Sequence, residues 1–198
     1  MGKKSDITKA KLVDTAKALF LERGFDGLKM QELADKAYIN KGLLHYYFKS
    51  KEALFQAVFQ EAMENLFGGV AEELLSDHAI ETKMHVIIDL YFDRLSANPG
   101  LPIFVLSEIH KNPTLNGLIN LGDVAPMLMS AISSQMDKPE EIESFLHLVL
   151  SVVSLCVFPF AARPLLSQLI GDVNKFEAFV EKRRGYVKNI STHLISEL

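Results

Sequence analysis

NKGLLHYYFKSK, residues 40–51, places four consecutive ring side chains, His45 to Phe48, between lysines. A buried helix would exclude the lysines, because burying an unpaired ammonium group is costly. A fully solvated helix would gain nothing from the rings, because apolar surface is stabilising only when it is covered. Tyr and His tips donate hydrogen bonds to phosphate oxygens, and lysines neutralise phosphates. The stretch therefore predicts a segment that binds a sugar-phosphate backbone.

Charge is divided unevenly along the chain. Residues 1–51 contain 11 Lys and Arg against 6 Asp and Glu, a formal charge of +5, although the whole chain carries −4. The remaining residues therefore carry −9. A basic N-terminal segment on an acidic remainder predicts that the N-terminal segment alone binds a polyanion.

Composition and motifs narrow the class of protein. The 198 residues are 48% hydrophobic and 23% charged, which is typical of a globular protein of one or two domains. A single cysteine, Cys156, rules out an internal disulfide framework and a Cys-based zinc site, so we expect a reducing compartment. No HExxH, G-x-S-x-G, P-loop or dinucleotide-binding glycine pattern occurs. We expect no enzyme activity, no metal and no cofactor.

Apolar side chains recur with helical spacing, and no stretch alternates with the period of two that marks a strand. We therefore expect an all-α fold. In the N-terminal quarter a first helix ends near Gly24, and helices follow at residues 30–37, 40–48 and 50–66. Further helices are expected at about residues 70–76, 82–97, 101–111, 114–135, 140–158, 162–170 and 172–197.

The longest apolar run, residues 145–162, approaches the length of a membrane span. It also contains His147, two serines and Pro159, which a lipid-facing helix disfavours. We interpret it as a buried interface helix and expect no membrane partner. Pro159 and Pro164 are expected to kink or interrupt it.

The short helices 30–37 and 40–48, joined by a turn and preceded by a longer helix, form a predicted helix-turn-helix. In that motif the second short helix lies in the major groove of DNA. Leu44 and Phe48 are four residues apart and face the core, which leaves the basic and polar-tipped residues outside. The candidate DNA-binding residues are Lys29, Lys41, Gly42, Leu43, His45, Tyr46, Tyr47, Lys49 and Lys51.

Residues 12–58 resemble the DNA-binding head of the TetR family of bacterial transcriptional regulators. The resemblance rests on TAKALFLERGF in the first helix, LADKA in the second and KGLLHYYFKSKEAL in the recognition segment. It implies a helix-turn-helix domain at residues 1–51, a connecting fourth helix at 50–66, and a helical ligand-binding and dimerisation domain at 52–198. It also implies a homodimeric, cytoplasmic repressor that leaves a palindromic DNA operator when a small-molecule effector binds.

Three residues depart from the family pattern. Lys29 stands where the second helix usually begins with Thr, and His45 replaces a Tyr, so a phosphate contact there would depend on pH near neutrality. Tyr38 stands where the turn usually has Gly, and a tyrosine resists positive φ. Either the turn adopts another geometry, or the chain accepts some strain.

The last two long helices, 140–158 and 172–197, correspond to the helices that form a four-helix dimer bundle in the family. Core packing within one subunit is the alternative for some of their residues. The residues that we assign to the dimer interface are Ser154, Phe158, Phe176, Phe179, Val180, Arg183, Val187 and Ile190.

His147 and Ser151 share a face of an otherwise apolar helix with Ser154 and Phe158. Such polar groups either orient an apolar ligand in a pocket or allow two helices to cross closely, with His147 in the interface. Flexible Met and planar Phe side chains suit an adaptable cavity, although a set of this kind is more often plain core. The pocket candidates are Met63, Phe67, Phe92, Phe104, Met127, His147 and Ser151.

A helical adaptor or small-molecule-binding protein that does not read DNA sequence is the alternative. It would account for the helical body but not for the +5 segment with its recognition-helix pattern. DNA affinity that falls with salt, at a slope reflecting several phosphates, separates the two hypotheses.

Overall fold

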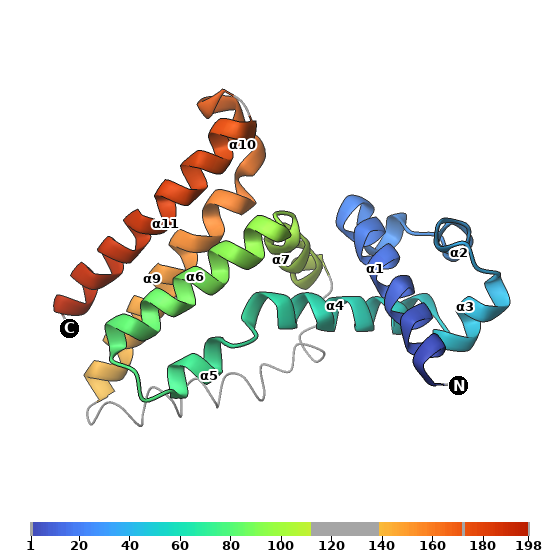
Figure 1. Ribbon diagram of the computed structural model, residues 1–198, viewed down its shortest axis with the longest axis horizontal. Coiled ribbons are helices and arrows are strands. Elements are labelled where there is room, and N and C mark those ends of the chain that lie inside the picture. Colours follow the sequence, from blue (N-terminus) through green and yellow to red (C-terminus); the bar gives the residue numbers. More distant parts are fainter. Residues whose placement is uncertain (1, 112–138, 172, 198) are drawn as a thin grey trace. The chain divides into compact units, whose positions relative to one another are not determined.

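A computed structural model describes residues 2–111, 139–171 and 173–197 of the chain. These residues form two compact units. The first unit holds residues 2–64 and 103–111, and the second holds residues 65–102 and 139–197. Every regular element in the described residues is a helix, which confirms the predicted all-α class (Figure 1).

The first unit contains α1 (Gly2–Gly27), α2 (Met30–Ala37), α3 (Lys41–Tyr47), most of α4 (Lys51–Phe67) and most of α7 (Leu101–Lys111). Helix α1 is interrupted at Gly24, where φ is 70° and ψ is −177°. Only glycine adopts this backbone region readily. The interruption falls at the glycine that the sequence marks as a helix end, although the helix resumes as far as Gly27.

Aromatic packing holds the first unit together. The Phe55 ring of α4 lies 5.1 Å from the Phe20 ring and 5.0 Å from the Phe25 ring, both on α1. The Phe104 ring of α7 lies 6.1 Å from the Phe55 and Phe59 rings. Phe104, a candidate pocket residue, is therefore a member of this core.

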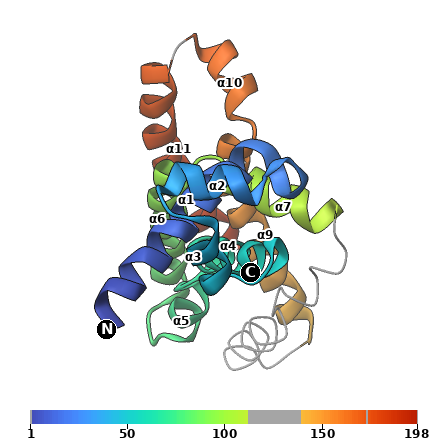
Figure 2. The same cartoon turned by 90° about the vertical axis from the view of Figure 1, so that its right-hand side faces the viewer.

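The second unit contains α5 (Val70–Leu75), α6 (Ile80–Ala97), α9 (Pro139–Ala161), α10 (Arg163–Ile170) and α11 (Val173–Ser196). Helices α6, α9 and α11 pack side by side, each against the other two. Helix α10 lies at one end of this three-helix bundle, next to α11 (Figure 1, Figure 2). The predicted helix at 114–135 lies outside the described residues.

The prolines act differently from the sequence prediction. Helix α9 continues through Pro159 and ends two residues later, at Ala161. Pro164 does not break a helix, because it occupies the first turn of α10. A proline there lacks only an N–H that no helix carbonyl would accept. The helix is therefore interrupted between Ala161 and Arg163, whereas the prediction placed a kink or interruption at Pro159 and Pro164.

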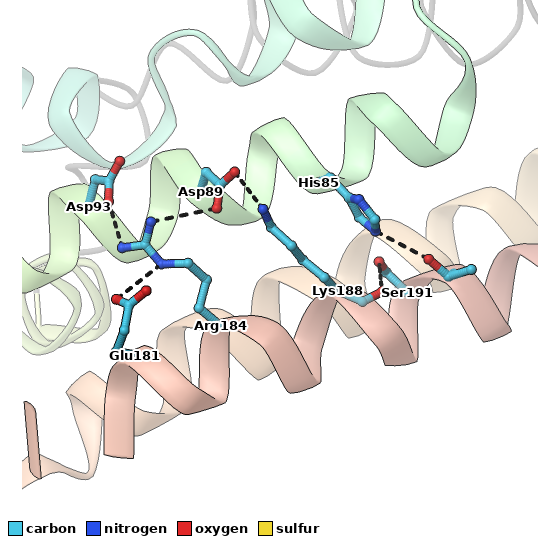
Figure 3. Close-up of polar contacts among 8 residues, drawn as sticks. His85, Asp89, Asp93, Glu181, Arg184, Lys188 and Ser191 are labelled. Carbon is cyan, nitrogen blue, oxygen red and sulfur yellow. Dashed lines mark hydrogen bonds and ion pairs between the residues drawn. The ribbon is translucent and has the colours of Figure 1, made fainter. Parts of the chain in front are cut away.

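Ion pairs join α6 to α11 in the second unit (Figure 3). Arg184 lies 2.6 Å from a carboxylate oxygen of Asp93 and 3.6 Å from one of Asp89, and Lys188 lies 2.6 Å from the other oxygen of Asp89. The guanidinium of Arg184 also lies 5.7 Å from the centre of the Phe92 ring. Partial burial strengthens such a network relative to isolated surface pairs. Sequence periodicity alone does not reveal this network.

We predict that Arg184→Met lowers the free energy of unfolding by about 1 kcal/mol, because Asp89 and Asp93 lose a shared cation. The matched control is Lys182→Met, which removes an equal charge from an exposed position of the same helix. Urea denaturation measures both variants. In about 1 M salt the difference between them should shrink, because salt screens ion pairs. Equal stability of the two variants at low salt would contradict the prediction.

Candidate nucleic-acid interface

The turn between α2 and α3 closes through a left-handed residue. Tyr38 has φ 56° and ψ 43° at the end of α2. Its N–H donates to the Asp35 carbonyl at 3.1 Å, and the Ile39 N–H donates to the Ala34 carbonyl at 3.0 Å. The two bonds form a Schellman motif, whose left-handed position is usually glycine. Of the two geometries that the sequence left open, the chain adopts the glycine-like turn with a tyrosine in it.

This turn is strained. A left-handed conformation costs a residue other than glycine about 1–2 kcal/mol. The Tyr38 side chain recovers little of this through burial, because it is 89% exposed. The ammonium of Lys11 lies 5.5 Å from the centre of its ring. An exposed cation–π contact of this kind contributes about 0.5–1 kcal/mol. The free-energy cost of the left-handed conformation is therefore only partly offset by the contact with Lys11.

Helix α3 begins directly after the turn and is capped by Asn40. The Leu43 N–H donates to the Asn40 side-chain oxygen at 2.7 Å. This bond satisfies one of the amides that the first turn of a helix leaves unpaired. Leu44 is completely buried, and Phe48 is 5% exposed just beyond the helix. The cap and the two inward residues confirm the predicted start and inner face of the recognition helix.

The outer face of α3 presents the predicted DNA-binding residues to solvent. Lys41, Gly42, His45 and Tyr46 are exposed, whereas the candidates Leu43 and Tyr47 are half-buried. The Tyr46 and Tyr47 rings meet edge to face at 5.4 Å. The structure therefore brings cation, imidazole and phenol groups together on one short helix.

The three flanking lysines differ in their surroundings. Lys29, just before α2, makes no side-chain cap hydrogen bond and is exposed, as is Lys49. The Lys51 ammonium lies 4.5 Å from the centre of the Phe25 ring, and it donates to the Asp26 carbonyl at 3.4 Å. Lys51 thus braces the start of α4 against the end of α1. A role for it in binding DNA stays a prediction.

Gly42 occupies the second position of α3, where the fold does not require a glycine. A Cβ atom built there would meet only the Asn40 side-chain oxygen, at 3.4 Å. Its φ is not positive, and glycine is a poorer helix former than alanine. The missing side chain therefore leaves open space on the outer face of α3.

The comparisons with known proteins agree with this geometry. Residues 12–58 match the family model described as bacterial regulatory proteins, tetR family. This span covers the helix-turn-helix, residues 12–27 of its bracing helix α1 and about the first half of α4.

Residues 12–58 belong to the TetR family of DNA-binding segments.

Relatives and solved structures extend the likeness to different extents. The transcriptional activator FasR of Mycolicibacterium smegmatis is 31% identical over 88 residues, which are 44% of this chain and 40% of FasR. The probable transcriptional regulator YttP of Bacillus subtilis is 26% identical over 170 residues, 82% of each protein. The match to FasR thus spans less than half of that protein.

Two solved structures share the fold at low sequence identity. A TetR-like transcriptional regulator from a Rhodococcus species superposes with a TM-score of 0.67 at 14% identity, over 96% of both chains. A TetR-family regulator from Streptomyces coelicolor gives 0.59 at 19% identity, over 99% of this chain and 82% of that one. The TetR-family fold therefore extends over nearly the whole chain.

The predicted ligand-pocket residues lie in dissimilar places. Phe104 is in the core of the first unit, and Phe92 is fully buried in the second, 5.9 Å from the Phe160 ring. His147 and Ser151 are exposed on α9. Met63 and Phe67 are half-buried on α4, and Met127 lies outside the described residues.

A cavity of about 280 Å³ is present in the second unit, between α6, α9, α10 and α11. The Arg163 guanidinium on its wall lies 5.3 Å from the centre of the Phe176 ring. None of the predicted pocket residues that the structure describes lines this cavity. Its lining consists of Ser96, Pro99, Phe160, Arg163, Phe176, Glu177, Val180 and Glu181.

The predicted dimer residues differ in burial and fall into three groups. Phe176, Val180 and Val187 on α11 are buried within a single chain. For these three residues the alternative of core packing within one subunit is therefore correct. Phe179, Arg183 and Ile190 are half-buried, whereas Ser154 and Phe158 on α9 are exposed. The exposed group continues along α9 through Leu146 and Leu150, which the sequence analysis did not select.

Neither the cysteine nor any acidic cluster adds chemistry to the site. Cys156 is buried on α9, and burial raises the pKa of its thiol to about 12, so the thiol is protonated at neutral pH. In the part of the chain that the structure describes, no group of three or more His, Cys, Asp or Glu residues is placed to hold a metal ion.

We predict that Asn40→Ala lowers the free energy of unfolding by about 1 kcal/mol, because the Leu43 amide loses its acceptor at the start of α3. Asn40→Ser is the matched control, since a serine hydroxyl caps a helix nearly as well. Guanidinium denaturation followed by circular dichroism measures both variants. An alanine variant as stable as the serine variant would show that the cap contributes nothing.

Proposed function

We propose that this chain is a transcriptional regulator that lays α3 in the major groove of a palindromic DNA operator. The observation that supports this most directly is the outer face of α3. There Lys41, His45 and Tyr46 are exposed on a helix that Leu44 anchors and Asn40 caps. The positions of a helix-turn-helix that approach DNA are those near the start of its second helix.

In this proposal, different residues contact the DNA bases and the DNA phosphates. Lys41 lies in the first turn of α3, where its ammonium reaches base edges or a phosphate. Gly42 lets the helix approach the groove without a side chain in between. His45, Tyr46 and the flanking Lys49 bind phosphates and fix the register of the helix on the duplex.

A second copy of the chain is the proposed occupant of the exposed face of α9. A palindromic operator needs two recognition helices about 34 Å apart, which a symmetric dimer supplies. The window Ile142–Ala161 is long and apolar enough to span a membrane by length and composition alone, and 33% of it is buried within the chain. Its exposed face mixes Leu150 and Phe158 with Glu143 and His147. A mixed surface of this kind fits a protein interface better than lipid.

We further propose that a small molecule bound in the second unit changes the spacing of the two heads. Helix α7 supports this route: residues 103–111 belong to the first unit, whereas α6 before them belongs to the second. Within the first unit, Phe104 of α7 packs against the Phe55 and Phe59 rings of α4, and the proposed route follows the chain through α7. The loss of DNA affinity equals the preference of the ligand for the altered state and no more.

The direction of regulation differs among the relatives. FasR is named as a transcriptional activator, and the KstR2 protein of Rhodococcus jostii, 27% identical over 101 residues, is named as a repressor. We propose repression relieved by ligand for this chain, in the bacterial cytoplasm. Members of the family are generally not enzymes, and the proposal includes no catalytic step.

Selection from a random duplex library should recover one palindromic motif with the purified parent protein. We predict that Gly42→Ala weakens binding to that motif at least about tenfold, because the added methyl group holds α3 away from the groove. The same substitution should raise stability by up to about 1 kcal/mol, because alanine is the better helix residue. Fluorescence anisotropy and urea denaturation measure the two effects.

Lys41→Ala is the companion variant in this experiment. It should also degrade the selected motif, and it should reduce the dependence of log affinity on log salt by about one unit if Lys41 contacts a phosphate. Recovery of sequence-blind binding alone from the parent would overturn the regulator proposal in favour of an adaptor.

The dimer proposal has its own test. We predict that Phe158→Glu converts the protein to a monomer at about 10 μM, because two carboxylates would be buried in the apolar part of a shared face. Leu75→Glu is the control, since Leu75 is also an exposed apolar residue but lies on α5. Sedimentation velocity measures the mass of each. A Phe158→Glu dimer as tight as the parent would place the interface elsewhere.

A further inference from the structure

We propose that Tyr38 is a DNA-backbone contact, held in its left-handed conformation so that its phenol reaches a phosphate beside α3. This inference rests on the proposed function and adds a residue that the family pattern does not include. Its starting point is the conformation of the turn. Tyr38 is the only residue other than glycine with a positive φ in the described part of the chain.

The fold itself does not need a tyrosine at this position. Both hydrogen bonds of the Schellman turn use backbone atoms, so glycine would form them without strain. The ring takes no part in the core, because the side chain is 89% exposed. A strained, exposed aromatic residue whose ring makes only one exposed cation–π contact within the protein is best explained by something outside it.

The position of Tyr38 identifies what lies outside. It stands three residues before Lys41 and one residue before the Ile39–Asn40 segment that leads into α3. The Lys11 ammonium from α1 lies 5.5 Å from the centre of the Tyr38 ring. A phenol hydroxyl and an ammonium group both donate hydrogen bonds, and a phosphate oxygen can accept from both.

The chemistry favours the DNA backbone over the bases. A phosphate contact is independent of sequence, so it should be measurable on any duplex. The probe is therefore a mixed-sequence duplex of about 30 base pairs in about 50 mM potassium chloride. The operator recovered by selection serves as a second probe.

The decisive variant is Tyr38→Gly. We expect its melting temperature to rise by about 2–4 °C, because the left-handed strain is removed. We expect its affinity for both duplexes to fall roughly fivefold or more, because each recognition helix loses a phosphate contact. A variant that becomes more stable and binds less tightly cannot owe its weaker binding to a damaged fold.

Two further variants separate the parts of the contact. Tyr38→Phe keeps the ring and the strain but removes the hydroxyl group, so it should lose most of the affinity with little change in melting temperature. Lys11→Ala should lower the dependence of log affinity on log salt by about one unit, whereas Tyr38→Gly should leave that dependence unchanged, because the phenol is neutral.

The outcomes distinguish this inference from the proposed function. If the parent binds and Tyr38→Gly binds both duplexes with the affinity of the parent, the Tyr38 contact is wrong while the regulator proposal stands. If Tyr38→Gly weakens binding but Tyr38→Phe does not, the hydroxyl contact to phosphate is wrong. If the parent binds neither duplex, the regulator proposal fails and the inference fails with it.

Discussion

The reversal of the chain between Ala37 and Asn40 is the constraint on which the outer face of α3 depends. Two backbone hydrogen bonds, from Tyr38 to Asp35 and from Ile39 to Ala34, end α2 and redirect the chain within three residues. Without a positive φ at Tyr38, α2 would continue and no separate recognition helix would start at Asn40. The burial of Leu44 then fixes the rotation of α3, and with it the face that Lys41, His45 and Tyr46 present.

At two positions of the helix-turn-helix, the residue is not the one that backbone stability alone favours. Tyr38 occupies a conformation that suits glycine, and Gly42 occupies a helical position that suits alanine. Both lie within a few residues of one another, next to the exposed face of α3. Departures from local rules that lie close together in the chain are typical of functional sites, in keeping with the proposed DNA contact.

In the second unit, the apolar faces of α9 and α11 are covered to different extents. Helix α11 turns Phe176, Val180 and Val187 into the chain's own core, and ion pairs from Arg184 and Lys188 hold it against α6. Helix α9 is covered on one side only, so Leu150 and Phe158 stay exposed. Periodicity marks an apolar face in both helices but does not say whether the surface that covers it belongs to the same chain.

The sequence by itself determined the all-α class, the helix-turn-helix, the cap at Asn40 and the inward position of Leu44, because these follow from spacing and side-chain chemistry within a few residues. Only the tertiary structure decided the rest. It chose the strained turn at Tyr38, placed Phe104 in the core of the first unit, and left His147 and Ser151 exposed. The turn at Tyr38 uses local hydrogen bonds, but the sequence pattern allowed two geometries for it. The positions of Phe104, His147 and Ser151 depend on which helices meet, and no local pattern encodes that.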